Sequence, residues 1–101
     1  MLDHAREAVE MAGDQTVDDL RANRQLNLAL VRLIEIIGEA ANRTSEEFRA
    51  SYPSIPWRDI IAMRNRVIHG YDSVDLKVVW DVIHYDLPTL IEQLNKIVSE
   101  S

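Results

Sequence analysis

The sequence has no cysteine, only three glycines and three prolines, and a single phenylalanine in 101 residues. Without cysteine the chain has no disulfide framework, no thiolate metal site and no cysteine nucleophile. The shortage of glycine and proline is typical of a regular, helix-rich protein with few turns. No run approaches the roughly 18 uncharged apolar residues that a membrane span needs. We therefore expect a soluble, cytoplasmic, all-α protein with no membrane partner.

The sequence is also short of positive charge, with 11 Lys and Arg against 17 Asp and Glu and a formal net charge of -6. Broad binding to polyanions depends on Lys and Arg that displace counterions along the phosphate backbone. Any contact with nucleic acid must therefore be local. The length and the 47% apolar content correspond to one compact domain over residues 1–101.

The spacing of apolar residues predicts helices along nearly the whole chain. A short first helix ends at Gly13, and Thr16 with Asp19 suggests a capping box that opens a brief helical turn. A long helix from about Asn23 to Asn42 follows, with an apolar stripe on one face. The stripe consists of Leu26, Leu30, Leu33, Ile34, Ile37, Ala40 and Ala41.

The second half of the chain begins with a further capping box and a loop. Thr44 with Glu47 forms the box, and the segment SYPSIP is the loop. Pro56 suits the first position of a third long helix that reaches His69, and Gly70 ends that helix.

A last long helix completes the predicted fold. Asp72 or Ser73 caps it, and Pro88 bends it near His84 by removing one backbone hydrogen bond, with Tyr85 packed around the bend. Its apolar stripe consists of Leu76, Val79, Trp80, Ile83, Leu87, Leu90, Ile91, Leu94 and Val98. The elements predict an up-and-down four-helix bundle with short extra helical turns in the connections.

The long helix from Asn23 to Asn42 carries apolar residues outside its stripe. Leu28, Val31 and Ile36 form a second apolar face, which predicts contact with another subunit. Gly38 fits this interpretation because it allows a neighbouring helix to approach closely. We therefore expect a homodimer.

The segment MRNRVIHGYD places chemically capable residues at the end of the third long helix. Arg64, Asn65, Arg66 and His69 lie on its polar face. The helix dipole favours the imidazolium form of His69, so this side chain can both take and give a proton near physiological pH. Asn65, four residues before it, can orient the imidazole. Arg64 is about 140° from His69 around the axis, so the two converge only through a cleft or across a two-fold axis.

The pattern Arg64-Asn65-x3-His69-Gly70-Tyr71 resembles the R-polar-x3-H-x-Y motif of the HEPN superfamily, in its HepT-like branch. The segments LIEIIGEAANR, IPWRDIIAMRN and VWDVIHYDLPTLIEQL are similar to helices of the same branch. The resemblance covers nearly the whole chain. The first helix, which opens at MLDH, is shorter than is usual in these proteins, and we expect core packing or dimer stability to suffer.

The resemblance implies a fold, an activity and a partner. The fold is a HEPN-like helical domain that dimerises. The activity is that of a metal-independent endoribonuclease toxin, with Arg64 and His69 catalytic and Asn65 and Arg66 in support. The partner is a cognate minimal nucleotidyltransferase antitoxin of the MntA type, which silences the toxin by attaching AMP to Tyr71.

The chemistry of these side chains agrees with RNA cleavage without metal. Such cleavage needs a base for the 2'-hydroxyl, an acid for the leaving 5'-oxygen and a cation for the phosphorane. His69 can serve as base and acid, and the planar fork of Arg64 can bind two phosphate oxygens. A metal site is a poorer interpretation, because His69 with Asp72 or Asp75 has no clustered third ligand. We expect no metal and no cofactor.

A second class of function stays open from the sequence. A non-catalytic helical interaction or nucleotide-binding module that partners a nucleotidyltransferase also fits an acidic chain with one cationic helix end. In that case Arg64 and His69 only bind a nucleotide or hold a partner. Tyr71 has an alternative role as a buried anchor of the turn. Two acids, Glu35 and Glu39, are expected on a solvated face or in interface salt bridges. Their expected partners there are Arg32 and Arg43.

Overall fold

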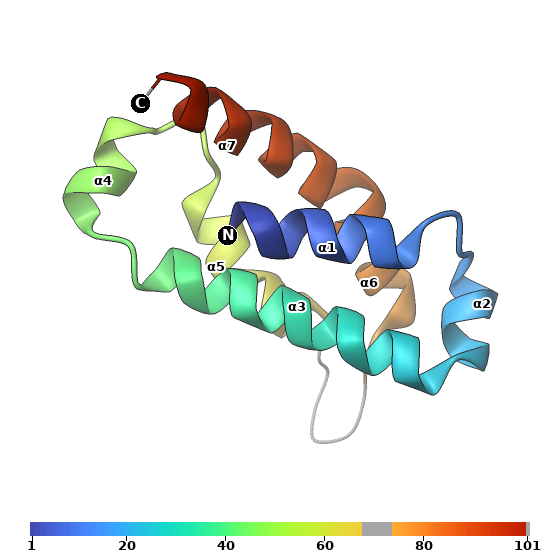
Figure 1. The fold of residues 1–101 in the computed structure, drawn as a ribbon. Helices are drawn as coiled ribbons and strands as arrows, with labels where there is room; N and C mark the ends of the chain where they lie inside the picture. The colour runs from blue at the N-terminus through green and yellow to red at the C-terminus, as the bar shows by residue number, and fades with distance from the viewer. Residues whose placement is uncertain (68–73, 101) are drawn as a thin grey trace.

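The computed structural model describes residues 1–67 and 74–100, the last two by their backbone alone, and every element in these ranges is helical (Figure 1). The long elements alternate in direction, so the predicted all-α, up-and-down bundle is confirmed. They are α1 (Leu2–Ala12), α3 (Arg24–Asn42), α5 (Trp57–Val67) and a continuous last stretch of α6 (Leu76–Asp81), the π-helical turn η1 (Val82–Asp86) and α7 (Leu87–Glu100). Two short helices, α2 (Val17–Ala22) and α4 (Glu46–Ser51), lie in the connections.

The core lies between α3 and its neighbours. Helix α3 packs against α1 and α5, and α1 also packs against α7, as Figure 1 shows for the α1 pairs. The predicted stripe of α3 supplies fully buried side chains, with Leu30, Ile34 and Ile37 each at 0% exposure. The buried residues of the other long elements include Ala5, Ala8, Ala12, Ile60, Met63, Val67, Val79, Val82, Ile83, Leu87, Leu90 and Leu94. Removal of this apolar surface from water is the main favourable term for the fold.

Side-chain caps fix where the helices in the first half begin. The Thr16 hydroxyl accepts from the Asp19 backbone N–H at 3.1 Å, and the Asp19 carboxylate accepts from the Thr16 N–H at 2.9 Å. This reciprocal pair confirms the predicted capping box. The Asn23 side chain accepts from the Leu26 N–H at 3.0 Å and opens α3 at the predicted place.

Two predicted starts in the second half are wrong by one residue. Ser45, not Thr44, caps α4, because its hydroxyl accepts from the Phe48 N–H at 3.1 Å. The Thr44 hydroxyl is used elsewhere, since it donates to the Ala40 carbonyl at the end of α3. Helix α5 begins at Trp57, after Pro56, as helix ends often shift by one residue.

The last helical stretch begins later than predicted. The Asp75 carboxylate accepts from the Val78 N–H at 3.2 Å and caps α6 at Leu76. The predicted caps, Asp72 and Ser73, lie outside the described residues and are too early in the chain for this start. Asp72, Ser73 and Asp75 are all residue types that cap helices, and they lie within four positions of one another. The spacing of the apolar residues does not show which of the three is the cap, so the prediction was wrong.

The distortion predicted before Pro88 takes the form of the π-helical turn η1. Proline has no N–H, so the carbonyl four residues earlier loses its α-helical donor. That residue is His84, whose ring stacks on Trp80 at 4.2 Å between centroids. The edge of the Tyr85 ring also meets Trp80, although Tyr85 is 62% exposed.

The second apolar face of α3 is only partly available to a partner. Val31 is 7% exposed and belongs to the core of the chain itself, whereas Leu28 is 50% exposed. A Cβ on Gly38 would lie 3.3 Å from the Ile60 carbonyl oxygen, so Gly38 serves the close approach of α5 within one chain. The link of Gly38 and Val31 to a subunit contact was therefore wrong, and the homodimer stays a prediction. None of the helices within residues 1–67 and 74–100 combines the length and the hydropathy that a membrane span requires.

Candidate functional site

The candidate site lies at the C-terminal end of α5. The inner face of this helix is fixed in the core, where Met63 is 2% exposed and Val67 0%. Arg64, Asn65 and Arg66, which lie between these two anchors, are all exposed. The helix therefore presents three polar side chains from a backbone that the core holds in place.

Arg64 turns toward α3, where Glu35 is its neighbour. The Arg64 Nε atom is 4.0 Å from a Glu35 carboxylate oxygen, which is an ion-pair distance but too long for a hydrogen bond. The side chain of Glu35 is 21% exposed, and it also pairs with Arg32 at 3.3 Å. Arg32 in turn lies 3.6 Å from Glu39. The predicted pairing of Glu35 and Glu39 with Arg32 is thus found within one chain.

This arrangement leaves Arg64 largely open to water. Its side chain is 59% exposed, and Glu35 divides its charge between two guanidinium groups. Exposed ion pairs are worth about 0–1 kcal/mol, so the contact does not lock Arg64. The guanidinium can exchange the carboxylate for a phosphate at little cost.

Arg66 turns the opposite way, toward η1. Its Nη1 atom donates to the Asp86 carboxylate at 2.8 Å, and both side chains are a little over 40% exposed. The two arginines therefore flank the end of α5, one beside α3 and the other beside the last helical stretch. Asn65 lies between them on the exposed side.

His69 and Tyr71 lie outside the described residues, so their predicted roles stay predictions. The residues on either side of that segment are described. The Asp75 N–H donates to the Val67 carbonyl at 2.7 Å, so the end of α5 and the start of α6 meet directly. The chain therefore leaves and re-enters the described fold at the Arg64 end of α5.

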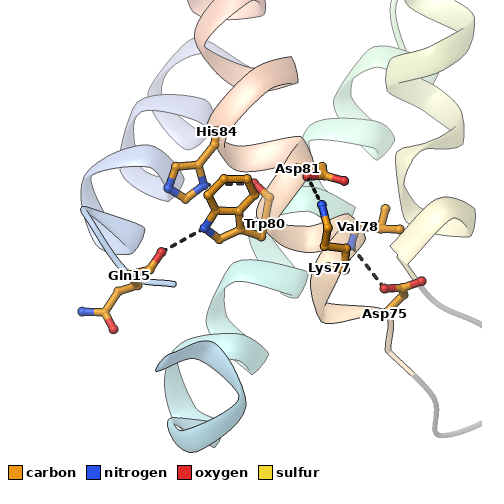
Figure 2. A network of polar contacts seen from close by, with 7 residues as sticks. All are labelled: Gln15, Asp75, Lys77, Val78, Trp80, Asp81 and His84. Carbon is orange, nitrogen blue, oxygen red and sulfur yellow. Dashed lines mark hydrogen bonds and ion pairs between the residues drawn. The ribbon is translucent and has the colours of Figure 1, made fainter. Parts of the chain in front are cut away.

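One hydrogen bond joins α6 to the turn between α1 and α2, and further polar contacts lie within α6 and η1 themselves (Figure 2). The Trp80 indole N–H donates to the Gln15 carbonyl at 3.0 Å, and Lys77 pairs with Asp81 at 2.9 Å. The His84 Nδ1 atom lies 2.9 Å from the Trp80 carbonyl. This contact and the stacking of its ring on Trp80 give His84 the packing role that the sequence predicted.

A pocket of about 180 Å³ opens beside Arg66, between α5 and the last helical stretch. Its walls are mainly apolar, and Gln93 of α7 contributes an amide to them. The polar residues around it include Asp59, Arg66, Tyr85, Asp86 and Thr89. This pocket places a partly open space next to Arg66, one of the predicted supporting residues.

Among the described residues no group of three or more His, Asp or Glu side chains could hold a metal ion. Metal independence itself stays a prediction, since it concerns the reaction. The cationic groups at the described part of the site are guanidinium groups, which bind phosphate through paired N–H donors.

Sequence reasoning missed three residues of this region. Glu35 was predicted in salt bridges that do not include Arg64, and no role was predicted for Asp86. Gln93 lies between apolar members of the last predicted stripe, and its own polar contact was not predicted. Helical spacing describes one helix at a time, so it gave no signal for contacts between helices. The i, i+4 spacing of Glu35 and Glu39 was the only available indication of a charged face on α3.

Comparisons with known proteins agree with one another. A family model described as "Ribonuclease HepT-like" matches residues 1–97. A Methanocaldococcus jannaschii protein named "Gamma-glutamylcyclotransferase and putative RNase" is 40% identical over 103 residues, covering 98% of this chain and 46% of that protein. A Thermococcus cleftensis protein named "Probable ribonuclease HepT" is 33% identical over 100 residues, covering 95% of this chain and 91% of that protein. No solved structure matches. The chain thus spans under half of the first relative and most of the second.

Proposed function

The chain belongs to the HepT-like ribonuclease family, and from this membership we propose that it is a metal-independent endoribonuclease with Arg64 and His69 as its catalytic residues. The observation that supports the proposal most directly is the state of Arg64. It is exposed and loosely paired, on a helix whose other face is buried. An exposed guanidinium with one loose ion pair can bind a phosphate through its N–H donors.

The proposed reaction is an attack of the RNA 2'-hydroxyl on the adjacent phosphorus. His69 accepts the proton of the 2'-hydroxyl as the new P–O bond forms. The bond from phosphorus to the 5'-oxygen then breaks, and a protonated histidine supplies the proton to the leaving oxygen. Arg64 stabilises the negative charge of the phosphorane through its N–H donors. The products are a 2',3'-cyclic phosphate and a free 5'-hydroxyl.

The proposal includes a homodimer. Arg64 and His69 are five residues apart, which separates them by about 140° around one helix axis. A two-fold pairing of the α5 ends brings Arg64 of one chain toward His69 of the other. The exposed Leu28 of α3 supports a partner on that side of the bundle, because it is a large apolar side chain that the chain itself leaves uncovered.

The proposal also includes a switch at Tyr71. In a toxin–antitoxin pair, a minimal nucleotidyltransferase of the MntA type transfers AMP from ATP to the Tyr71 oxygen, and pyrophosphate leaves. The added phosphodiester carries a negative charge close in sequence to Arg64, where it competes with the RNA phosphate. Cleavage is then blocked without unfolding. Intact-mass analysis after co-expression with such an enzyme should show AMP-sized increments in the wild type and none in Tyr71→Phe.

The test of the activity is cleavage of total RNA in EDTA. The wild type should cut, whereas Arg64→Ala and His69→Ala should lose about a hundredfold or more of the rate, as expected when a charge-stabilising or proton-transfer group is removed. Arg58→Ala is the matched control, because Arg58 is an exposed arginine at the start of the same helix. Equal cutting by all four proteins would show a contaminating nuclease.

The alternative function is a non-catalytic module that binds a nucleotide or a nucleotidyltransferase. The acidic net charge of -6 favours it over a nuclease of broad specificity. Wild-type protein that cuts no RNA in either EDTA or Mg²⁺, yet binds the nucleotidyltransferase, would select this alternative and exclude the catalytic proposal.

A further inference from the structure

The Glu35 carboxylate of α3 lies between two arginines and binds one of them more closely. The Arg32 Nη1 atom donates to one carboxylate oxygen of Glu35 at 3.3 Å. The Arg64 Nε atom lies 4.0 Å from the other oxygen, which is too far for a hydrogen bond. A contact between opposite charges is stronger when it includes a hydrogen bond. Glu35 therefore binds Arg32 in preference to Arg64.

Arg32 differs from Arg64 in how much negative charge surrounds it. Glu35 and Glu39 follow Arg32 by three and seven residues, so all three side chains lie on one face of α3. Glu39 lies 3.6 Å from Arg32. Arg32 thus has two carboxylates around one positive charge, which makes it a poor site for a further anion. Arg64 faces the shared carboxylate from the longer distance and is the better site for a phosphate.

The directions of α3 and α5 place Arg32 on the side of the candidate site. A Cβ on Gly38 would approach the Ile60 carbonyl oxygen, whereas Glu35, three residues earlier in α3, faces Arg64, one turn later in α5. The two helices therefore run in opposite directions. Arg32 lies a further three residues toward the level at which α5 ends. It contacts Glu35 from the side where the candidate site lies.

We propose that Arg32 is a positioning residue, which keeps Arg64 open to a phosphate by holding Glu35. This inference rests on the proposed ribonuclease function and adds to it a residue that does not bind the substrate itself. Without Arg32, Glu35 loses its closer cationic partner and pairs with Arg64 for more of the time. A phosphate then has to displace the carboxylate, because both bind the same N–H donors.

The expected effect is modest because the pairs are exposed. The side chains of Arg32 and Arg64 are each 59% exposed, and an ion pair of this kind changes an equilibrium constant by up to about fivefold. We therefore expect Arg32→Ala to raise the KM for RNA by about two- to fivefold. The kcat should stay within about twofold, because the reacting groups are unchanged. The variant should fold, since alanine is the strongest helix former and Arg32 lies on the surface.

The first experiment is a double-mutant cycle on the cleavage of a short RNA. Arg32→Ala should raise KM in the wild type and leave it nearly unchanged in the Glu35→Gln background, where no carboxylate can move onto Arg64. Arg32→Lys should keep a KM near that of the wild type, because the lysine ammonium can also bind Glu35. Arg43→Ala is the matched control for the loss of one positive charge, since Arg43 is an exposed arginine at the end of the same helix.

Three results of this cycle would overturn the proposal. An equal rise in KM in both backgrounds would show that Arg32 attracts the RNA by its own charge. A rise of the same size in Arg43→Ala would show a general effect of net charge. A KM that does not change in Arg32→Ala would show that Glu35 stays away from Arg64 without help.

The second experiment measures phosphate binding without cleavage. Inorganic phosphate is titrated into the ¹⁵N-labelled wild type, Arg32→Ala and Arg43→Ala at constant ionic strength, and the Nε–H signal of Arg64 is followed by NMR. The midpoint should lie at about two- to fivefold higher phosphate in Arg32→Ala and should be unchanged in Arg43→Ala. Equal midpoints in Arg32→Ala and the wild type contradict the proposal. So does an Arg64 signal that phosphate does not shift in the wild type.

The two experiments together separate this inference from the proposed function. The phosphate titration needs no nuclease activity. A shifted midpoint in Arg32→Ala, in a protein that cuts no RNA, would refute the proposed ribonuclease function and support the role of Arg32. RNA cleavage with equal phosphate midpoints would refute the role of Arg32 and leave the ribonuclease function in place.

Discussion

The contact between Glu35 and Arg64 predicts the effect of removing one negative charge beside the site. In Glu35→Gln the shape of the side chain is kept and the charge is lost. Arg64 then no longer has to break an ion pair with Glu35 before it binds a phosphate. We expect the KM for RNA to fall and kcat to stay within about twofold, because binding is changed and the chemistry is not.

The size of the effect follows from the distance and the exposure. Two unit charges 4.0 Å apart attract by about 1 kcal/mol in water and about 4 kcal/mol at an effective dielectric of 20. Arg64 is 59% exposed and Glu35 also faces Arg32, so the lower end applies. A change of up to about 1 kcal/mol corresponds to a KM up to about fivefold lower.

The assay is steady-state cleavage of a short fluorescent RNA at low salt and at about 0.5 M salt. The fivefold gain should shrink at high salt, because ions screen an exposed pair. Glu39→Gln is the matched control, since Glu39 lies 3.6 Å from Arg32 and, within the described ranges, forms no ion pair with Arg64. A tenfold fall in kcat for Glu35→Gln with an unchanged KM would refute the reasoning and make Glu35 a positioning residue for Arg64.

Three further predictions concern the fold and the assembly. Met63→Ala should lower the free energy of unfolding by about 2–5 kcal/mol in urea titration, because Met63 is 2% exposed in the core beneath the site; a loss under 1 kcal/mol would contradict its burial. Asp75→Ala should cost about 0.5–2 kcal/mol by loss of the α6 cap, whereas Asp75→Asn should retain most of it, and equal thermal midpoints for both variants would argue against the cap. Light scattering at micromolar concentration should give twice the chain mass of 11.6 kDa, and a monomer that cuts RNA at the full rate would exclude a shared site.

The sequence predicted the positions of the long helices well because each of them buries one stripe of apolar residues. The interval pattern of α3 identified Leu30, Ile34 and Ile37, all fully buried, and Thr16 with Asp19 located the start of α2. These signals are local, since a stripe or a cap depends on residues within one or two turns. The start of α6 was less predictable, because several residues before it can all cap a helix.

Only the residues of the candidate site that lie on α5 could be predicted from the sequence. Arg64 was found from its place in the motif and Arg66 from the polar face of the same helix, and both are exposed as expected. Their partners, Glu35 and Asp86, come from other helices and depend on how α5 is rotated in the bundle. The Gln93 amide donates to a carbonyl of the loop at Ser54, and no periodicity encodes that contact.

The π-helical turn Val82–Asp86 takes one extra residue into the last helical stretch. Its hydrogen bonds span five residues and not four, so the wider turn absorbs that residue and leaves α6 and α7 in nearly the phase of one α-helix. Deletion of a single residue from this turn would therefore restore α-helical spacing and keep Leu90 and Leu94 in the core. The same deletion within α7 would rotate the residues after it by about 100°. The turn is thus the place in this stretch where a change of one residue in length disturbs the core least.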